Sequence, residues 1–315
     1  METKELIIAN IKVPVPIIQG GMAVRISTAP LAGAVANEGG IGIIAGTGMT
    51  VKELIAEIRK ARAITKGTLG VNVLFAVRNF ADLVKAAIEE GIDLIISGAG
   101  FSRDMFSWGK KYGTPIVPIV SSAKLAMLAE KLGAAAVVVE GKEAGGHLGT
   151  DRPLKDILKE VLKSIKIPVI AAGGIISGQD IGEVMKIGAV GVQMGTIFAA
   201  SEESNASAEM KQIYLRAKEQ DVAIIKSPVG FPGRVIKNDF YKALIKKDLS
   251  NIHPCSACLK RCSKDFCIMD ALLNACKTGN PDKALVFAGE KVYNIREILP
   301  VSTIFKTLLN ELTNK

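Results

Sequence analysis

The chain has 315 residues, of which 49% are hydrophobic, and a mean hydropathy of +0.30, so it is long enough for one large domain or two ordinary ones. The formal net charge is +9, but the lysines are spread over expected helices and aromatic residues make up only 5%, a pattern that argues against nucleic-acid binding. No apolar run approaches the roughly 18 to 20 residues of a membrane helix, and the first residues lack the profile of a secretory signal, so we expect a cytoplasmic protein.

Eight short apolar runs follow one another through the first two thirds of the chain, and each ends in glycine or a small polar residue. They read VPIIQGG, GIGIIAG, LGVNVLF, LIISGAG, PIVPIVSS, AAVVVEG, IPVIAAGG and AVGVQMG. Apolar runs without alternation indicate strands that are covered on both faces, as in parallel sheets. Amphipathic stretches typical of helices lie between them, at Val51–Ala63, Phe80–Glu90, Ala123–Leu132, Leu154–Ser164, Gly178–Ile187 and Ala206–Glu219.

Eight strand–helix units over about 210 residues predict an α/β fold, a (β/α)8 TIM barrel. The alternative is an open doubly wound sheet. That fold needs a G-x-G-x-x-G fingerprint near the first strand, which Gly20-Gly21-Met22 does not supply.

The repeating pattern ends after Glu219, where a segment rich in proline and glycine, IIKSPVGFPGRVIKN, precedes a cysteine-rich one. We expect residues 1–215 and 285–315 to form the barrel, and residues 216–284 to form a smaller, mainly helical lid domain near the C-terminus. Helices are expected over Met269–Ala275 and Val301–Leu312, the second returning to the barrel. The prolines would stiffen a loop over the ligand site, in which Arg234 either binds a phosphate or forms a surface ion pair.

All five cysteines lie between positions 255 and 276, and the first four are spaced C-x2-C-x3-C-x4-C. In a cytoplasmic protein a disulfide is the poorer hypothesis. Four thiolates in one short segment can hold zinc or an iron–sulfur cluster, which predicts Cys255, Cys258, Cys262 and Cys267 as metal ligands. Cys276 could replace Cys267, and His253 could also serve. Unliganded thiols are the alternative to a metal centre.

In a barrel, the carboxyl ends of the strands and the loops after them carry the site. Here these ends are rich in glycine and uncharged hydrogen-bonding groups, which suits a large, flat ligand approached by the backbone. No lysine stands at the end of a predicted buried strand, which argues against a Schiff-base mechanism. The strand ends also lack a cluster of Asp, Glu and His, which argues against a metal hydrolase. Glycines after the seventh and eighth strands predict a phosphate site at Gly173-Gly174 and Gly195-Thr196, with tight turns as the alternative.

The motifs PIIQGGM, GVN, ISGAG, PIVSSA, VVEGKEAGGHLG, PVIAAGGI and GVQMGT, in this order over about residues 14–200, resemble the FMN-dependent nitronate monooxygenase family. That family is related to flavin-type enoyl-acyl-carrier-protein reductases and to some NADH:quinone reductases. The resemblance implies an FMN-binding barrel, with the phosphate at the two glycine turns. The FMN-binding residues that it implies are Gly20, Gly21, Met22, Asn72, Lys124, Glu140, Gly145, Gly146, Ala172, Gly173, Gly174, Gln193, Met194, Gly195 and Thr196.

By the same resemblance, His147 is the catalytic residue. It is one of only two histidines and lies in a glycine-rich loop, where Gly141, Gly145 and Gly146 would allow a flavin to come close. Imidazole titrates near neutral pH, so it can give or take a proton. The alternative is a histidine that only hydrogen-bonds the loop or the flavin edge. Lys124 could offset charge on a reduced flavin, and Glu140 could bind a hydroxyl of the FMN chain or simply end its strand.

Three functions follow from these observations. The first is a nitronate monooxygenase, in which His147 orients or deprotonates the nitro compound and oxygen is consumed without NAD(P)H. The second is an NAD(P)H-dependent FMN reductase of enoyl thioesters or quinones, which an iron–sulfur centre would favour. The third is a redox sensor without turnover, which the presence of His147 disfavours. We expect a small-molecule substrate and a homodimer, with no nucleic-acid or membrane partner.

Overall fold

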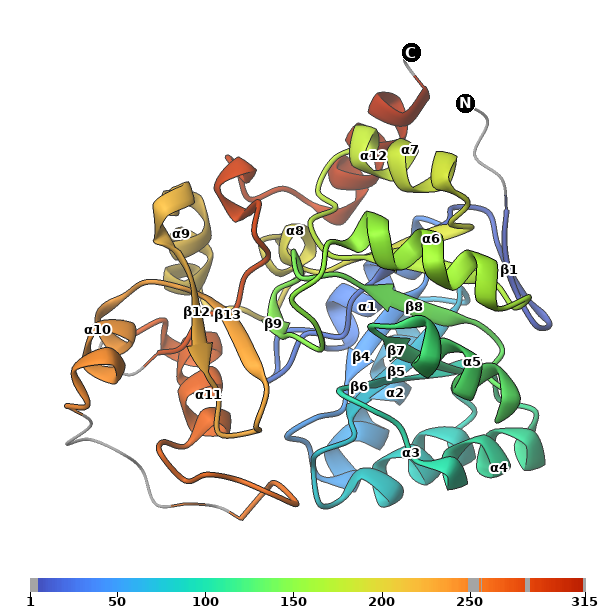
Figure 1. Cartoon of the computed structure of the whole chain (residues 1–315), viewed down its shortest axis with the longest axis horizontal. Helices are drawn as coiled ribbons and strands as arrows, with labels where there is room; N and C mark the ends of the chain where they lie inside the picture. The colour runs from blue at the N-terminus through green and yellow to red at the C-terminus, as the bar shows by residue number, and fades with distance from the viewer. Residues whose placement is uncertain (1–4, 249–254, 256, 281–283, 314–315) are drawn as a thin grey trace.

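The computed structural model describes residues 5–248, 255, 257–280 and 284–313. Its centre is a closed barrel of eight parallel strands in the order β3-β11-β10-β8-β7-β6-β5-β4 (Figure 1). A parallel bridge between Ile18 and Ile41 joins the last strand to the first, with Gln19 N donating to Ile41 O at 3.0 Å. The predicted (β/α)8 barrel is therefore confirmed. Its strands are β3 (Ile17–Gln19), β4 (Gly42–Ala45), β5 (Leu69–Leu74), β6 (Leu94–Gly98), β7 (Ile116–Val120), β8 (Val137–Glu140), β10 (Val169–Ala172) and β11 (Gly191–Met194).

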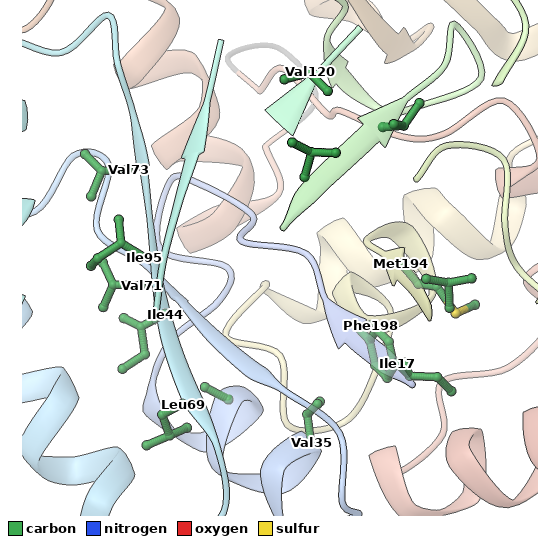
Figure 2. Close-up of a cluster of buried hydrophobic side chains, with 14 of the residues drawn as sticks. Ile17, Val35, Ile44, Leu69, Val71, Val73, Ile95, Val120, Met194 and Phe198 are labelled. Carbon is green, nitrogen blue, oxygen red and sulfur yellow. The ribbon is translucent and has the colours of Figure 1, made fainter. Parts of the chain in front are cut away.

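Alternate residues of each strand face two separate cores. In β8, Val137 and Val139 belong to the outer core between strands and helices, whereas Val138 belongs to the core inside the barrel. Figure 2 shows part of the outer core, including Val71 and Ile95. Both faces of a strand are therefore apolar, which explains the unbroken apolar runs in the sequence.

Helices surround the barrel, and α2, α4, α5 and α7 each begin with a side-chain cap. α2 begins with a capping box between Thr50 and Glu53, and α7 with one between Ser177 and Asp180. The helices in chain order are α1 (Ala29–Asn37), α2 (Val51–Ile64), α3 (Phe80–Glu89), α4 (Arg103–Tyr112), α5 (Ala123–Lys131), α6 (Leu154–Ser164) and α7 (Gly178–Ile187). The eighth position, between α7 and α1, is filled by α12 (Val301–Thr313), where Glu311 accepts from Gly178 N at 2.7 Å.

A short antiparallel hairpin covers the barrel at the amino ends of its strands. It consists of β1 (Leu6–Ile8) and β2 (Ile11–Val13), whose Leu6, Ile8 and Val13 join the inner core. Leu6 lies beside Gly191, where β11 begins. The apolar plug closes this end, so a ligand can enter only from the opposite end of the barrel.

The excursion after β11 forms a separate lobe beside the barrel (Figure 1). It contains α8 (Thr196–Ala199), α9 (Ala208–Arg216), η1 (Glu219–Asp221), β12 (Val222–Lys226), β13 (Pro232–Ile236), α10 (Asp239–Lys246), α11 (Ile268–Thr278) and η2 (Val292–Asn294). A second core joins α9 and α11 to residues 284–295 through side chains such as Tyr214, Cys276 and Val286. Residues on both sides of each expected domain boundary, at 215/216 and at 284/285, contribute to this core. The division into two domains stays a prediction.

The proline-rich segment is not the expected loop but an antiparallel hairpin, β12–β13. Its turn is made by Ser227, whose N–H donates to Phe231 O, and by Gly230 at φ +95°. Pro232 stands at the start of β13, where a missing N–H is tolerated. β13 then pairs with a third short strand, β9 (Gly146–His147), and this pairing fastens the lobe to the barrel.

No helix in the described ranges combines the length and the apolar composition that crossing a bilayer requires.

Candidate functional site

A cavity of about 240 Å³ lies at the carboxyl ends of the barrel strands, between the barrel and the lobe. Its wall contains almost every residue that the sequence assigned to the cofactor and the chemistry. These are Gly20, Gly21, Met22, Asn72, Glu140, Gly145, Gly146, His147, Ala172, Gly173, Gly174, Gln193, Met194, Gly195 and Thr196. The fold therefore brings together residues that span most of the barrel sequence.

Lys124 is the exception, and its expected place beside the flavin gains no support from the fold. It is the second residue of α5, its side chain is exposed, and it is not part of the cavity wall. Ser122 caps α5 by accepting from Leu125 N, so the helix begins directly after β7 and turns Lys124 to solvent. The cavity wall contains a different cation, Lys291, which the sequence analysis missed.

Lys291 is held by Asp180, in the first turn of α7, through an ion pair of 2.5 Å. Burial alone would raise the pKa of Asp180, but hydrogen bonds from Lys291 and from Ile176 N outweigh burial and lower the pKa. Gly173 and Gly174, at φ +105° and +66°, lie in the same wall. A positive charge held in the same cavity wall as two glycine turns is an arrangement that suits a phosphate group.

His147 lies on β9, where its backbone pairs with Gly233 of β13. Its Nε2 is 2.8 Å from the Ser227 hydroxyl oxygen, and its ring packs edge-to-face with that of Phe287, with centroids 5.1 Å apart. Burial lowers the pKa of His147 to about 4, so the imidazole is neutral near pH 7. A neutral imidazole in a cavity wall can donate one hydrogen bond and accept another.

The glycine-rich loop before His147 is tightly packed against the protein itself. A Cβ on Gly141 would lie 2.4 Å from Leu154 N, and one on Gly145 would lie 2.6 Å from the carbonyl carbon of Ala288. Neighbouring backbone therefore requires glycine at these two positions, whether or not a flavin also approaches them. Gly146 differs, because its φ of +83° is the feature that calls for glycine there.

Arg234 of β13 reaches this same loop. Its Nε donates to Ala144 O at 3.1 Å and its Nη2 to Lys142 O at 2.6 Å. These contacts support neither of the two hypotheses for Arg234, a phosphate ligand or a surface ion pair, and both stay predictions. The guanidinium instead holds two backbone carbonyls and so fixes the loop that carries His147.

Two further groups in the cavity wall are suited to hydrogen bonds with a ligand. Burial raises the pKa of Glu140 to about 8, so this carboxyl is protonated near pH 7 and can donate. Gln193 Oε1 is buried and has no hydrogen-bond partner within the described ranges. Buried polar atoms are nearly always paired in folded proteins, so a donor from outside the chain is expected there. Together with Lys291 and the glycine backbone, these groups fit a flat, polar-edged ligand with a phosphate, as FMN is.

The cysteine segment is fastened across the barrel mouth, but it does not form a metal site in the described part of the chain. Leu259 bridges to Val77, and Lys260 donates to Phe75 O at 2.7 Å while lying 3.8 Å above the Phe75 ring. Among the described residues, no three His, Cys, Asp or Glu are placed to hold a metal ion. The predicted metal ligands Cys255, Cys258, Cys262 and Cys267 thus gain no support, and His253 lies outside the described residues.

Cys276 is separated from this segment, which corrects its role as an alternative ligand. It lies in the second core, where its thiol donates to Asn205 O at 3.3 Å. Burial raises the pKa of Cys276 to about 11, so the thiolate that binds metals is disfavoured.

The wall that the lobe contributes to the cavity was not predicted from the sequence. Its members are Tyr214, Val229, Ile268, Met269, Leu272, Phe287, Ala288, Gly289, Lys291 and Val292. The rule that a barrel site lies after its strands could not find them, because they come from a different part of the chain. The one available signal was the small pair Ala288-Gly289, whose backbone meets Gly145.

A backbone-lined cavity at the carboxyl ends of a (β/α)8 barrel defines the class of protein, a barrel enzyme with a cofactor-sized site. The family model of nitronate monooxygenase matches residues 4–311. The chain therefore belongs to the nitronate monooxygenase family, a family of oxidoreductases, and membership implies a flavin cofactor.

Several known proteins are similar to this chain. The structure of FabK from Thermotoga maritima has 33% sequence identity and a TM-score of 0.86, covering 96% of this chain and 94% of that one. A nitroalkane oxidase from Streptomyces ansochromogenes has 25% identity and a TM-score of 0.83, covering 96% of each chain. A probable nitronate monooxygenase of Staphylococcus aureus is 31% identical, over 78% of this chain and 81% of its own length.

Another relative is an octahydroindene-carboxyl-CoA dehydrogenase of Mycobacterium tuberculosis, 33% identical over 232 residues. The match covers 73% of this chain and 65% of that protein, so the chain spans a little less than two thirds of this relative's length.

Proposed function

We propose that the chain is an FMN-dependent nitronate monooxygenase, which oxidises alkyl nitronates with oxygen and takes no electrons from NAD(P)H. The observation that carries this proposal is the neutral imidazole of His147 in the wall of a cavity lined by glycine backbone. Family membership and the nitronate monooxygenase and nitroalkane oxidase relatives support the choice of substrate.

FMN would lie in the cavity described above, and when bound it would supply the redox chemistry. Lys291 and the turns at Gly173-Gly174 and Gly195-Thr196 would hold its phosphate, while protonated Glu140 and the acceptor of Gln193 would bind its polar groups. His147 would hydrogen-bond the substrate. Apolar side chains of α11, Ile268, Met269 and Leu272, would exclude water from the opposite side.

A second candidate is a reductase or dehydrogenase of acyl thioesters that uses NAD(P)H. The similarity to FabK extends over 96% of this chain, lobe included, and another relative acts on a CoA thioester by name. The apolar wall of α11 also suits an acyl chain. As further proposals, the protein works in the cytoplasm on a small-molecule substrate and assembles as a homodimer.

An anaerobic stopped-flow experiment separates the candidates. The flavin-loaded protein is mixed with propionate-3-nitronate, or with NADH or NADPH, and the flavin absorbance is followed. Rapid bleaching by nitronate alone is the expected result. Bleaching only by a nicotinamide would overturn the monooxygenase and favour the thioester enzyme. A protein without a flavin band, even after FMN is added back, would overturn both.

A further inference from the structure

Ser227 is a buried hydroxyl in direct contact with the proposed catalytic imidazole. It is only 2% exposed, at the turn between β12 and β13, and its Oγ lies 2.8 Å from His147 Nε2. The backbone N–H of Val229 donates to the same oxygen at 3.3 Å. One lone pair of Oγ is therefore already occupied from within the turn.

The hydroxyl proton of Ser227 needs an acceptor, because a buried hydroxyl that donates to nothing loses its bond to water without replacement. Within the described ranges, His147 Nε2 is the acceptor that hydrogen-bonds this oxygen. If Nε2 carried a proton instead, it would donate to Oγ, and the hydroxyl proton would have no partner. The unprotonated state of Nε2 is thus the one that satisfies both groups.

We propose that Ser227 is a positioning residue that donates to His147 Nε2 and so fixes the imidazole as the neutral tautomer protonated on Nδ1. Nε2 is then in use, and Nδ1–H is the polar group that His147 can offer to a ligand. The site is accordingly built to donate a hydrogen bond to an acceptor oxygen of the substrate. It is not built to remove a proton from carbon.

Other contacts of His147 agree with this assignment. The edge contact with Phe287 and the pairing of β9 with β13 restrict rotation of the ring, so Nε2 stays directed at Ser227. The lowered pKa of His147 fits as well, because an imidazolium would carry a proton on both nitrogens and lose the bond that Ser227 donates. The titratable groups that share the cavity wall are Glu140, Tyr214 and Lys291, and none of them hydrogen-bonds the imidazole within the described ranges.

The tautomer fits the substrate class of the proposed function, on which this step rests. A nitronate is already deprotonated at carbon and offers its anionic oxygens to a donor, as the Nδ1–H tautomer requires. A thioester carbonyl is also an acceptor, so the assignment of Ser227 survives if the second candidate is correct.

The direct test is nitrogen NMR of the histidine rings in the flavin-loaded, oxidised protein labelled with 15N-histidine. The chain has two histidines, so a His253→Gln variant assigns His147 at once. At pH 7 we expect the His147 spectrum of a neutral ring with Nε2 unprotonated. A protonated Nε2, in a neutral or a charged ring, would overturn the proposal whether or not the protein oxidises nitronates.

Variants of Ser227 test whether its hydroxyl determines the tautomer of His147. In Ser227→Ala, both neutral tautomers of His147 should be populated, whereas Ser227→Thr keeps the hydroxyl and should give the wild-type spectrum. Ser263 is an exposed serine of the same lobe, so Ser263→Ala is the control and should leave the spectrum unchanged. In turnover, Ser227→Ala should lower kcat about tenfold or more while KM and FMN binding stay within about twofold. A Ser227→Ala spectrum identical to wild type would show that something else sets the tautomer and would overturn the role of Ser227.

Discussion

The barrel and the lobe contribute to the same cavity in different ways. The barrel contributes mostly backbone and amide groups, at glycines such as Gly173 and Gly195 and at the side chains of Asn72 and Gln193. The lobe contributes charged, aromatic and apolar side chains, including Lys291 and Phe287. The comparison indicates that the barrel wall would bind the flat cofactor, which is common to the family, whereas the lobe holds the imidazole of His147, the proposed catalytic group, in position.

The largest effect is expected where the two regions meet, at His147. His147→Ala should retain FMN, because the glycine cradle remains, but lower turnover by about a hundredfold or more. Steady-state kinetics and flavin absorbance measure the two effects separately. His253→Ala is the matched control and should turn over at the wild-type rate. Full activity of His147→Ala would remove the imidazole from the mechanism.

The next effect concerns the close packing of the glycine loop against the lobe. Gly145→Ala would place a Cβ 2.6 Å from the Ala288 carbonyl carbon and 2.7 Å from Gly289 N. Backbone must shift, so we expect a loss of about 1–3 kcal/mol in the free energy of unfolding, measured by urea titration. Gly98→Ala in β6 is the control, since its nearest neighbour would be 3.7 Å away. Equal stability of the two variants would mean that the loop and the lobe are not in firm contact.

Lys291→Met tests whether the lobe also contributes to cofactor binding. Removing the cation should weaken FMN binding about tenfold, or about 1.4 kcal/mol, and leave riboflavin binding unchanged, because riboflavin has no phosphate. Fluorescence titration with both ligands gives the two dissociation constants. Lys155→Met, which breaks the exposed ion pair with Glu183, should affect neither. Equal losses for FMN and riboflavin would place Lys291 away from the phosphate.

The smallest expected effect is a pH dependence of the free energy of unfolding, which comes from Glu140 in the barrel wall. The pKa of Glu140 is raised to about 8 from an ordinary 4.5, so the folded state holds a proton that the unfolded state releases. Stability from this group is therefore full below pH 4.5 and is lost as the pH rises through 8. Between pH 5 and pH 8, the free energy of unfolding of the flavin-free protein should fall by about 1 kcal/mol relative to that of Glu140→Gln. This value is smaller than the pKa shift alone would give, because water in the open cavity solvates the carboxylate.

His147 contributes a dependence of opposite sign over a lower range that overlaps that of Glu140. Its pKa is lowered to about 4, so its contribution to stability is full above pH 6.5 and is lost as the pH falls through 4. Urea titrations of wild type and Glu140→Gln at intervals of pH separate the two contributions, because the His147 contribution is present in both proteins and cancels in their difference. A constant difference between wild type and Glu140→Gln from pH 5 to pH 8 would mean that the carboxyl is ionised in the folded protein.

Much of the barrel and its half of the site could be predicted because a parallel barrel repeats one local pattern. Each apolar run is a strand covered on both faces, and the residue after it must lie at the active end. Gly173 and Gly195, which directly follow β10 and β11, come from that rule, whereas the role of His147 came from the family resemblance. Lys124 could not be placed from the sequence, because a side chain at the start of a helix can point toward the site or toward solvent. The register of α5 determines which of the two directions it takes.

The lobe has no such repeat. Ser227 and Arg234 lie in a hairpin whose prolines led us to predict a loop. Their roles depend on the pairing of β13 with β9. The contact between Ser227 and His147 joins residues that are 80 positions apart in the chain. Lys291 owes its place to Asp180, 111 residues away. Contacts at such separations leave no local pattern, so single-sequence reasoning could not find them.

The position of α12 has a consequence for synthesis of the protein. Strand β11 ends at Met194, yet the helix that completes the ring, α12, begins only at Val301. While a ribosome is still making the lobe, the strands already emerged would have an uncovered apolar stripe between α7 and α1. We expect that nascent barrel to need protection by a chaperone until α12 is released, and to bind flavin only afterwards.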